Sequence, residues 1–269
     1  MPKVNREDIA PIQLLLPPLP EQCRIVEILD EADAIVRTTE ALIAAKLKHK
    51  RAWAELLLTG KARFPEFAGE AWQEITIGSL LLEVERPVIW DDEAHYDLVS
   101  IRRRSEGLFY RGKVKGETIK TKNLKGIKTG DFLISKMQVV HGAWGLVPPE
   151  YDGHQVSGSY ITLIPKSGIH LDMRFFDFLS QLPYVYRLAL VSSHGVHIEK
   201  MTFNSELLFR EKVKIPTVLA EQTRIAETLG LMENEIGLLR CELAALKAQK
   251  QGLMQKLLTG EVRVKEFTP

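Results

Sequence analysis

The sequence predicts a mixed α/β fold, in which one globular domain is joined to two long helices that form an antiparallel coiled-coil stalk. Residues 19–67 recur without a gap as residues 219–267, with 17 identical positions. Both copies carry apolar residues at heptad spacing, which is typical of coiled coils. The sequence between them contains short alternating runs bounded by Gly and Pro, as strands do. A duplicated segment on either side of unique sequence indicates internal two-fold pseudo-symmetry.

The first copy is predicted to be a helix of about 40 residues, or about 60 Å at 1.5 Å per residue. It starts after a Pro-rich segment at residues 17–20 and ends at Gly60, a residue suited to a helix C-terminus. Lys46 and Lys50 interrupt its apolar seam. The apolar seam residues are Ile25, Leu29, Val36, Ile43, Trp53 and Leu57.

The second copy repeats this pattern up to Gly260, with one interruption at Lys250. Its seam residues are Ile225, Leu229, Met232, Ile236, Leu239, Leu243, Leu246, Leu253 and Leu257. Helices of this length exceed the width of a domain of about 150 residues, which favours a coiled coil over two helices packed on a globular core. Because the termini of a compact domain usually lie close together, the two helices should run antiparallel.

The repeat also predicts the domain boundaries. We expect a first helical region at 16–63, the globular domain at 64–213 and a second helical region at 214–269. Residues 1–15 would be a remnant tail leading into the first helix, because the segment beginning at Asn5 resembles the one beginning at Asn204.

The globular segment is predicted to alternate strands and short helices. A strand and short helix should occupy 72–82, and further strands 96–102, 132–135 and 160–164, while Asp172 should cap a helix rich in Phe and Leu. Gly residues between these elements predict several exposed loops.

Charge is strongly uneven within this domain, although the chain as a whole carries only +1. From Arg102 to Lys136 there are eleven Lys and Arg against three acids, and from Glu66 to Asp97 nine acids against one Arg. Clustered basic side chains favour contact with nucleic-acid phosphates. The alternative is a solvated Lys-rich hairpin that pairs with the acidic stretch before it.

The candidate DNA-binding residues fall into two groups. Phosphate contacts are expected mainly from the Lys and Arg residues, and base contacts from Gln138, His141 and His194. The full set is Arg102, Arg103, Arg104, Arg111, Lys113, Lys115, Lys120, Lys122, Lys125, Lys136, Gln138, His141 and His194.

Motifs for self-sufficient catalysis are missing from the sequence. It contains no phosphate-binding loop, no Gly-x-Gly-x-x-Gly run and no Asp/Asn-Pro-Pro-Tyr/Phe methyltransferase signature. His194 and His197, with Glu199, have metal-like spacing, but Gly195 favours a loop. Ser192 and Ser193 beside His194 have no evident acid partner for nucleophilic catalysis. We therefore expect no catalytic residues, no metal and no cofactor.

Composition places the chain among intracellular proteins. No run approaches the length of a membrane span, and the N-terminal segment does not resemble a signal peptide. The two cysteines, Cys23 and Cys241, lie on the predicted helices. These features favour the reducing cytoplasm and no membrane partner.

Several short motifs occur in a characteristic order. Each long helix follows a Leu-Pro or Ile-Pro pair, begins with Glu-Gln-x-Arg-Ile and ends with Leu-Leu-Thr-Gly. Between them stand Trp72 with Ile-Gly-Ser-Leu at 77–80, Val-Ser-Ile at 99–101, the segment 128–136 and Val-Ser-Gly-Ser-Tyr at 156–160. Over nearly the whole chain, this order resembles the specificity (S) subunits of type I restriction–modification systems.

The resemblance implies a non-catalytic DNA-binding role. In that family each target recognition domain reads one half of a split DNA site through the major groove. The conserved helices form an antiparallel coil that separates the half-sites and docks adenine methyltransferase (M) subunits, and complete systems add restriction (R) subunits. The chain would thus direct a methyltransferase to double-stranded DNA.

One departure from the family pattern leaves alternatives open. The family order is domain, helix, domain, helix, whereas this sequence runs helix, domain, helix. A truncated or phase-varied product, a recombination cassette and a naturally half-length subunit each fit. A monomer would read one half-site and a homodimer a palindrome. The alternative function is a coiled-coil interaction module, or a silent or decoy cassette, that binds methyltransferase subunits without useful DNA recognition.

Overall fold

The computed structural model describes residues 16–195 and 201–264. The chain divides into two compact units, one comprising residues 1–50 and 231–269 and the other residues 51–230. The division falls within the two long helices, so one end of each helix belongs to the same unit as the globular domain. The expected remnant tail at 1–15 lies outside the described residues.

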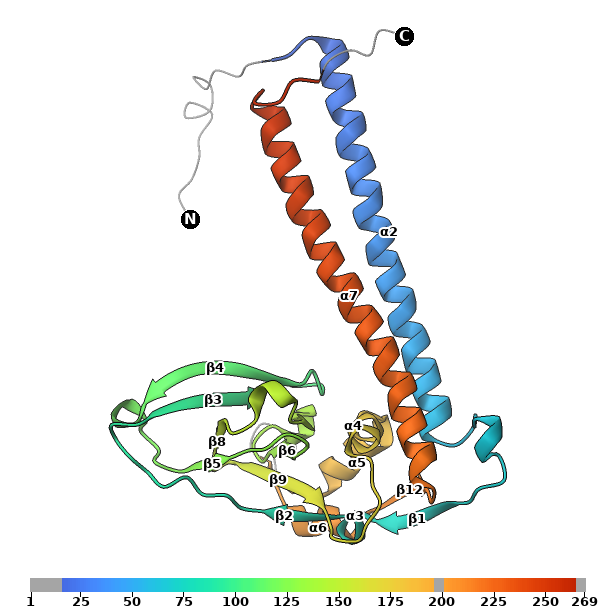
Figure 1. Ribbon diagram of the computed structural model, residues 1–269, viewed down its shortest axis with the longest axis vertical. Coiled ribbons are helices and arrows are strands. Elements are labelled where there is room, and N and C mark those ends of the chain that lie inside the picture. Colours follow the sequence, from blue (N-terminus) through green and yellow to red (C-terminus); the bar gives the residue numbers. More distant parts are fainter. Residues whose placement is uncertain (1–15, 196–200, 265–269) are drawn as a thin grey trace. The chain divides into compact units, whose positions relative to one another are not determined.

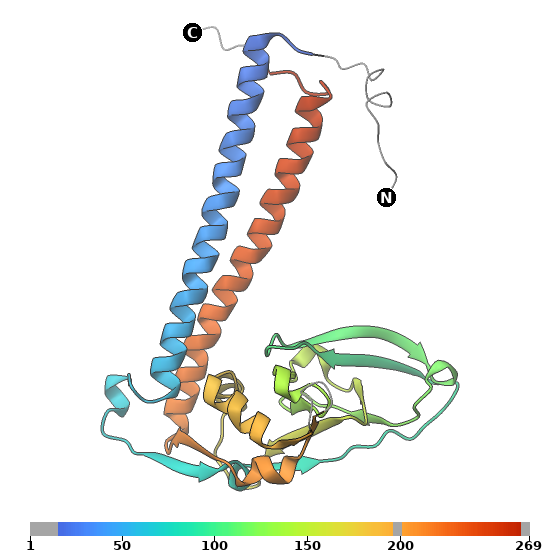
Figure 2. The ribbon, with the colours of Figure 1, turned by 180° about the vertical axis from the view of Figure 1, so that it is seen from behind.

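The two long helices are α2 (Leu19–Leu58) and α7 (Leu219–Leu258), each of 40 residues. In the first unit they lie side by side and run antiparallel (Figures 1 and 2). Lys50 Nζ lies 2.9 Å from Glu233, and Lys250 pairs with Asp33. In the 200-residue repeat Lys50 corresponds to Lys250 and Asp33 to Glu233, so the two ion pairs occupy equivalent positions. The lysines that interrupt the predicted seam therefore form pseudo-symmetric ion pairs across the coil.

Burial along the helices follows the seam closely at most positions. Ile25, Val36, Ile43, Leu57, Ile225, Leu229, Ile236 and Leu257 are buried. Leu29, Met232, Leu239, Leu243, Leu246 and Leu253 are half-buried. Trp53 is 37% exposed, the highest fraction among the predicted seam residues.

Both helices end as their sequences predict. Gly60 and Gly260 adopt left-handed φ values of 71° and 74°. Ala62 N–H donates to Leu56 O at 3.1 Å, and Val262 N–H makes the same 3.1 Å bond to Lys256 O. These bonds close a C-terminal turn that only Gly enters without strain.

The globular unit contains two four-stranded sheets and two short two-stranded ones (Figures 1 and 2). One large sheet has the order β2 (Leu81–Val84), β9 (Tyr160–Pro165), β6 (Phe132–Ser135), β7 (Trp144–Leu146). The other has the order β4 (Leu108–Lys115), β3 (His95–Ile101), β8 (Gln155–Ser157), β5 (Leu124–Gly126). The short sheets pair β1 (Trp72–Thr76) with β12 (Lys212–Pro216), and β10 (Ser193–His194) with β11 (Thr202–Phe203).

Short helices complete the unit. The α-helices are α3 (Ile77–Leu80), α4 (Met173–Ser180), α5 (Pro183–Val191) and α6 (Ser205–Arg210). The 3-10 turns are η1 (Pro65–Phe67), η2 (Gly116–Thr118), η3 (Val139–His141) and η4 (Pro149–Tyr151). Asp172 caps α4 by accepting hydrogen bonds from the N–H groups of Arg174 and Phe175, which confirms the predicted helix start.

An apolar core joins residues of both large sheets and the loops between them. Its members are Val99, Ile101, Leu108, Ile127, Leu133, Ala143, Val147, Val156 and Tyr160. On the sheet that contains β6, Phe132 meets Phe176 of α4 edge to face at 5.1 Å. The core packs β3, β4 and the loop after β6 against one another.

Each unit contains one copy of an arginine–glutamate clasp. In the globular unit Arg63 donates two hydrogen bonds to Glu221, at 2.9 and 2.7 Å, and Trp72 Nε1 donates a third at 3.2 Å. In the coil unit Arg263 donates two to Glu21, at 2.7 and 2.6 Å. All four clasp residues belong to the 200-residue repeat, so the pseudo-symmetry extends to specific polar contacts.

Candidate nucleic-acid interface

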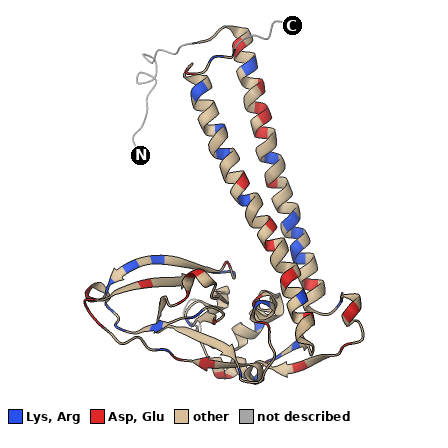
Figure 3. Cartoon of the chain, viewed as in Figure 1, with Lys and Arg blue, Asp and Glu red and all other residues tan. Residues whose placement is uncertain are grey.

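The edge strand β4 carries basic side chains outward. It pairs with β3, and the register shifts between Leu98 and Val99, so that Arg111 is the extra residue of a β-bulge. Arg111 and Lys113 are exposed, and neither forms an ion pair with a residue that the structure describes. Figure 3 shows the blue segments along this strand. Edge strands with Lys and Arg resist pairing with other strands, and they also suit an anionic partner.

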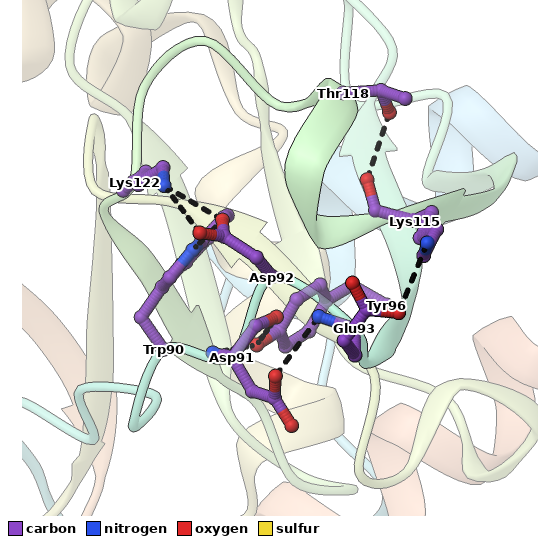
Figure 4. Close-up of polar contacts among 8 residues, drawn as sticks. All are labelled: Trp90, Asp91, Asp92, Glu93, Tyr96, Lys115, Thr118 and Lys122. Carbon is purple, nitrogen blue, oxygen red and sulfur yellow. Dashed lines mark hydrogen bonds and ion pairs between the residues drawn. The ribbon is translucent and has the colours of Figure 1, made fainter.

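Acidic residues before β3 neutralise two of the predicted DNA contacts (Figure 4). Lys122 Nζ lies 2.6 and 2.9 Å from the two carboxylate oxygens of Asp92, and Lys115 lies 3.1 Å from Glu93. The hydrogen bond from Lys122 holds the pKa of Asp92 below its ordinary value. Trp90 stacks on Tyr96 at 5.1 Å and supports this acidic segment. For Lys115 and Lys122, the alternative of a hairpin paired with acids is therefore correct in the free protein.

Lys125 is a structural residue. It lies on β5 with only 6% of its surface exposed, and its Nζ donates to Glu85 at 2.6 Å and to Tyr160 O at 3.2 Å. The hydrogen bond from Lys125 lowers the pKa of Glu85. The expectation that Lys125 contacts phosphate is wrong, because its ammonium is already paired inside the domain.

The turn between β3 and β4, residues 102–107, is the arginine loop. Arg102 N–H donates to Gly107 O at 2.9 Å and closes the turn. Arg104 and Ser105 have φ values of 61° and 53°, in the left-handed region. Non-Gly residues in that region cost about 1–3 kcal/mol each. Surrounding contacts must therefore hold the arginine loop in this shape.

Those contacts come from the segment 136–142, here named the Gln138 loop. Arg104 N–H donates to His141 O and Ser105 N–H to Gly142 O, both at 2.7 Å. Arg103 Nε donates to the side-chain Oε1 of Gln138, also at 2.7 Å. One side-chain and two backbone hydrogen bonds thus lock the two loops together.

Tyr186 of α5 contacts both the arginine loop and the Gln138 loop. Its hydroxyl lies 2.8 Å from Ser105 Oγ, and burial raises its pKa. A Cβ atom on Gly142, whose φ is +67°, would lie 2.3 Å from the Tyr186 ring, so only Gly fits there. The Trp144 ring packs against the same ring at an interplanar angle of 54°, with the ring centroids 4.5 Å apart. The aromatic pair anchors the loop junction to the core.

The remaining candidates occupy varied positions. Arg102 stacks over Phe109 at 4.9 Å and donates to Leu108 O at 2.9 Å. Arg104 and Lys120 are exposed and form no ion pair within the described ranges. Lys136 is half-buried, and its carbonyl accepts from Phe203 N–H of β11, which brings the β10–β11 hairpin beside the Gln138 loop.

The two histidine candidates differ in accessibility. His194 is exposed on β10, where it remains a candidate base contact. The Nε2 atom of His141 is buried, and the backbone carbonyl of His141 accepts the hydrogen bond from Arg104 N–H. The partners considered for a metal with His194, namely His197 and Glu199, lie outside the described residues. Within 16–195 and 201–264 no His, Cys, Asp and Glu side chains group as metal ligands.

Sequence reasoning missed two parts of this site and one structural contact elsewhere in the globular unit. The left-handed pair Arg104–Ser105 and the role of Tyr186 have no local signature. The Arg63–Glu221 clasp was marked only by the identity of both residues in the repeat.

No helix in the described part of the chain has the length and apolar character needed to cross a membrane.

Comparison with known proteins places these features in a family context. No protein-family model matches the chain. The putative type I restriction enzyme MjaX specificity subunit of Methanocaldococcus jannaschii is 26% identical over 286 residues, which cover 97% of this chain and 62% of the relative. The MjaVIII specificity subunit of the same organism is 23% identical over 301 residues, which cover 99% of this chain and 66% of the relative.

The chain is therefore similar over nearly its whole length to type I restriction specificity subunits. It spans less than two thirds of the length of these curated specificity subunits. The crystal structure of a type I S subunit from M. genitalium has the same fold over 89% of this chain and 61% of its own, with a TM-score of 0.57 and 17% identity. Both curated relatives are named as specificity subunits of type I restriction enzymes.

Proposed function

We propose that this chain is a DNA-binding specificity subunit, and that its globular domain reads one half of a DNA site for an adenine methyltransferase and its restriction complex. The main support is the basic surface formed by β4 and the arginine loop on a specificity-subunit fold. Arg104, Arg111 and Lys113 are exposed there without an ion pair among the described residues. Basic side chains on a rigid β-scaffold suit the phosphates that border a groove.

The test is the salt dependence of duplex binding by the full chain. Replacing Arg111 and Lys113 with Gln should weaken binding to all duplexes. It should also reduce the slope of log K against log salt by roughly 0.9 for each phosphate that the variant no longer neutralises. Lys212→Gln is a matched control, because Lys212 is an exposed lysine on β12, in a different sheet. An unchanged slope in the double variant would remove the support for this surface.

The coiled coil is the proposed docking element for methyltransferase subunits, and through them for restriction subunits. Its described part exposes large apolar side chains at heptad spacing: Ile35 at 52%, Leu42 at 43%, Leu231 at 70% and Leu238 at 72%. Exposed apolar stripes at that spacing are typical of helix-in-groove or helix-bundle partners. Replacing Leu231 and Leu238 with Gln should reduce copurification with the methyltransferase while thermal unfolding stays unchanged.

Oligomeric state and compartment belong to the same proposal. A homodimer would present two identical recognition domains and select a palindrome, whereas a monomer would select one half-site. Light scattering of the full chain, alone and with duplex, distinguishes the two. A cytoplasmic location fits a protein that acts on chromosomal DNA.

A second candidate function is a coiled-coil interaction module without useful DNA recognition. The ion pairs that neutralise Lys115 and Lys122 favour it, because they reduce the free positive charge of the hairpin. Methylation sequencing with and without the gene separates the two functions. A changed methylome supports DNA reading, and an unchanged methylome despite methyltransferase binding supports the interaction module.

A further inference from the structure

Resting on the proposed DNA-reading function, we propose that Arg103 reads a guanine in the major groove and that Gln138 is the residue that positions it. The two side chains come from loops 35 positions apart in the sequence and meet in a single 2.7 Å hydrogen bond. Both loops are fixed from beneath by Tyr186. The pair is therefore set in place before any DNA arrives, as specific recognition requires.

The backbone geometry explains why Arg103 occupies this position. The left-handed residues Arg104 and Ser105 follow it directly and turn the chain back toward the Gln138 loop. Backbone strain that neighbouring contacts hold in place is frequent at ligand-binding sites. Here the strained turn places an exposed arginine at the tip of the β3–β4 hairpin, the end of the domain's rigid sheet.

The chemistry of the pair selects among bases. Gln138 Oε1 accepts from Arg103 Nε, and the guanidinium carries four further N–H donors and no acceptor. Guanine presents two acceptors in the major groove, N7 and O6, which match the guanidinium fork. Adenine presents an acceptor beside an N6 donor, which the donor-only guanidinium disfavours. Arg103 also takes part in a further interaction in the free protein.

Arg111 contrasts with this pair. It lies along β4 as a bulge residue, and no side-chain hydrogen bond to a residue in the described part of the chain orients it. A cation that no such hydrogen bond orients contributes affinity for phosphate without base discrimination. Arg111→Ala is therefore the matched control, in the same hairpin and with the same loss of charge.

The experiment is selection of binding sites from randomised duplexes by the full chain, with its methyltransferase partner present, followed by binding constants for each single-base change. In the unaltered chain one position should require guanine. Arg103→Ala and Arg103→Lys should each lose about 5- to 150-fold discrimination at that position alone, because lysine keeps the charge but lacks the fork. Arg111→Ala should weaken all duplexes and leave the selected motif unchanged.

Gln138 is tested as a positioning residue. Gln138→Ala should reduce discrimination at the same guanine and at no other position, and Gln138→Glu should restore it, because a carboxylate keeps the acceptor for Arg103 Nε. If Arg103→Lys retains full discrimination, or if Arg103→Ala weakens all sequences equally, the proposal is overturned while DNA reading stands. If the unaltered chain enriches no motif, the proposed function fails and the proposal with it.

Discussion

Replacing Glu221 with Gln should destabilise the globular unit strongly. Glu221 is 1% exposed and accepts three hydrogen bonds, two from Arg63 and one from Trp72. An amide of the same shape keeps one acceptor but turns an NH₂ group toward the Arg63 guanidinium. The substitution therefore leaves a positive charge without its counter-ion at a buried position.

The magnitude follows from this burial. Removing one partner of a buried ion pair costs about 3–5 kcal/mol, and the residual 19% exposure of the Arg63 side chain lets water offset part of that, so we expect about 2–4 kcal/mol. For a domain of this size the midpoint of thermal unfolding should fall by roughly 5–15 °C.

The repeat supplies the control. Glu21→Gln removes the equivalent carboxylate from the other clasp, where the Arg263 side chain is 61% exposed and no Trp donates in the described structure. Thermal unfolding of both variants, followed by circular dichroism and by Trp fluorescence, compares the same chemistry at two levels of burial. A decrease for Glu221→Gln no larger than that for Glu21→Gln would refute the reasoning.

Three further predictions concern single residues. Lys125→Ala should lower the unfolding temperature but leave the salt slope of duplex binding unchanged; a flattened slope would restore Lys125 as a phosphate contact. Gly142→Ala should displace the Gln138 loop from Tyr186. Base discrimination, measured by competition with mismatched duplexes, should be lost while non-specific affinity is kept. Retained discrimination would contradict the proposed close packing. Burial opposes ionisation of Asp172, but hydrogen bonds from Arg174 and Thr223 outweigh it and hold its pKa below the ordinary 3.8. The contribution of the Asp172 carboxylate to the free energy of unfolding is therefore complete above its ordinary pKa of 3.8 and is lost as pH falls through the lowered pKa. Asp172→Asn should therefore reduce the loss of stability that occurs as pH falls through the acid range. An unchanged loss would count against this role of Asp172.

Much of the fold has a local sequence signal. The helix ends at Gly60 and Gly260, the strand Phe132–Ser135 and the cap at Asp172 each depend on residues a few positions apart. Hydrophobic periodicity, helix and strand propensity and helix capping all act over that range, so the sequence alone predicts these features. The heptad seam has the same basis.

The candidate site depends on contacts between distant segments. Lys125 looks like its exposed neighbours in the sequence, yet strand pairing with β8 buries it beside Glu85. The bond from Arg103 to Gln138 and the support from Tyr186 join residues up to 81 positions apart. No local pattern encodes these contacts, so composition indicated a basic surface but not which side chains remain available on it.

The most direct test of DNA reading is enrichment of randomised duplexes by the full chain with its methyltransferase partner, at an ionic strength of about 0.15 M, where non-specific attraction is screened within about 8 Å. We expect the recovered duplexes to share one motif that contains a required guanine, and to bind at least about 10³-fold tighter than unrelated DNA. Recovery of duplexes with no common motif, at affinities that vary only with salt, would contradict a DNA-reading role for this chain.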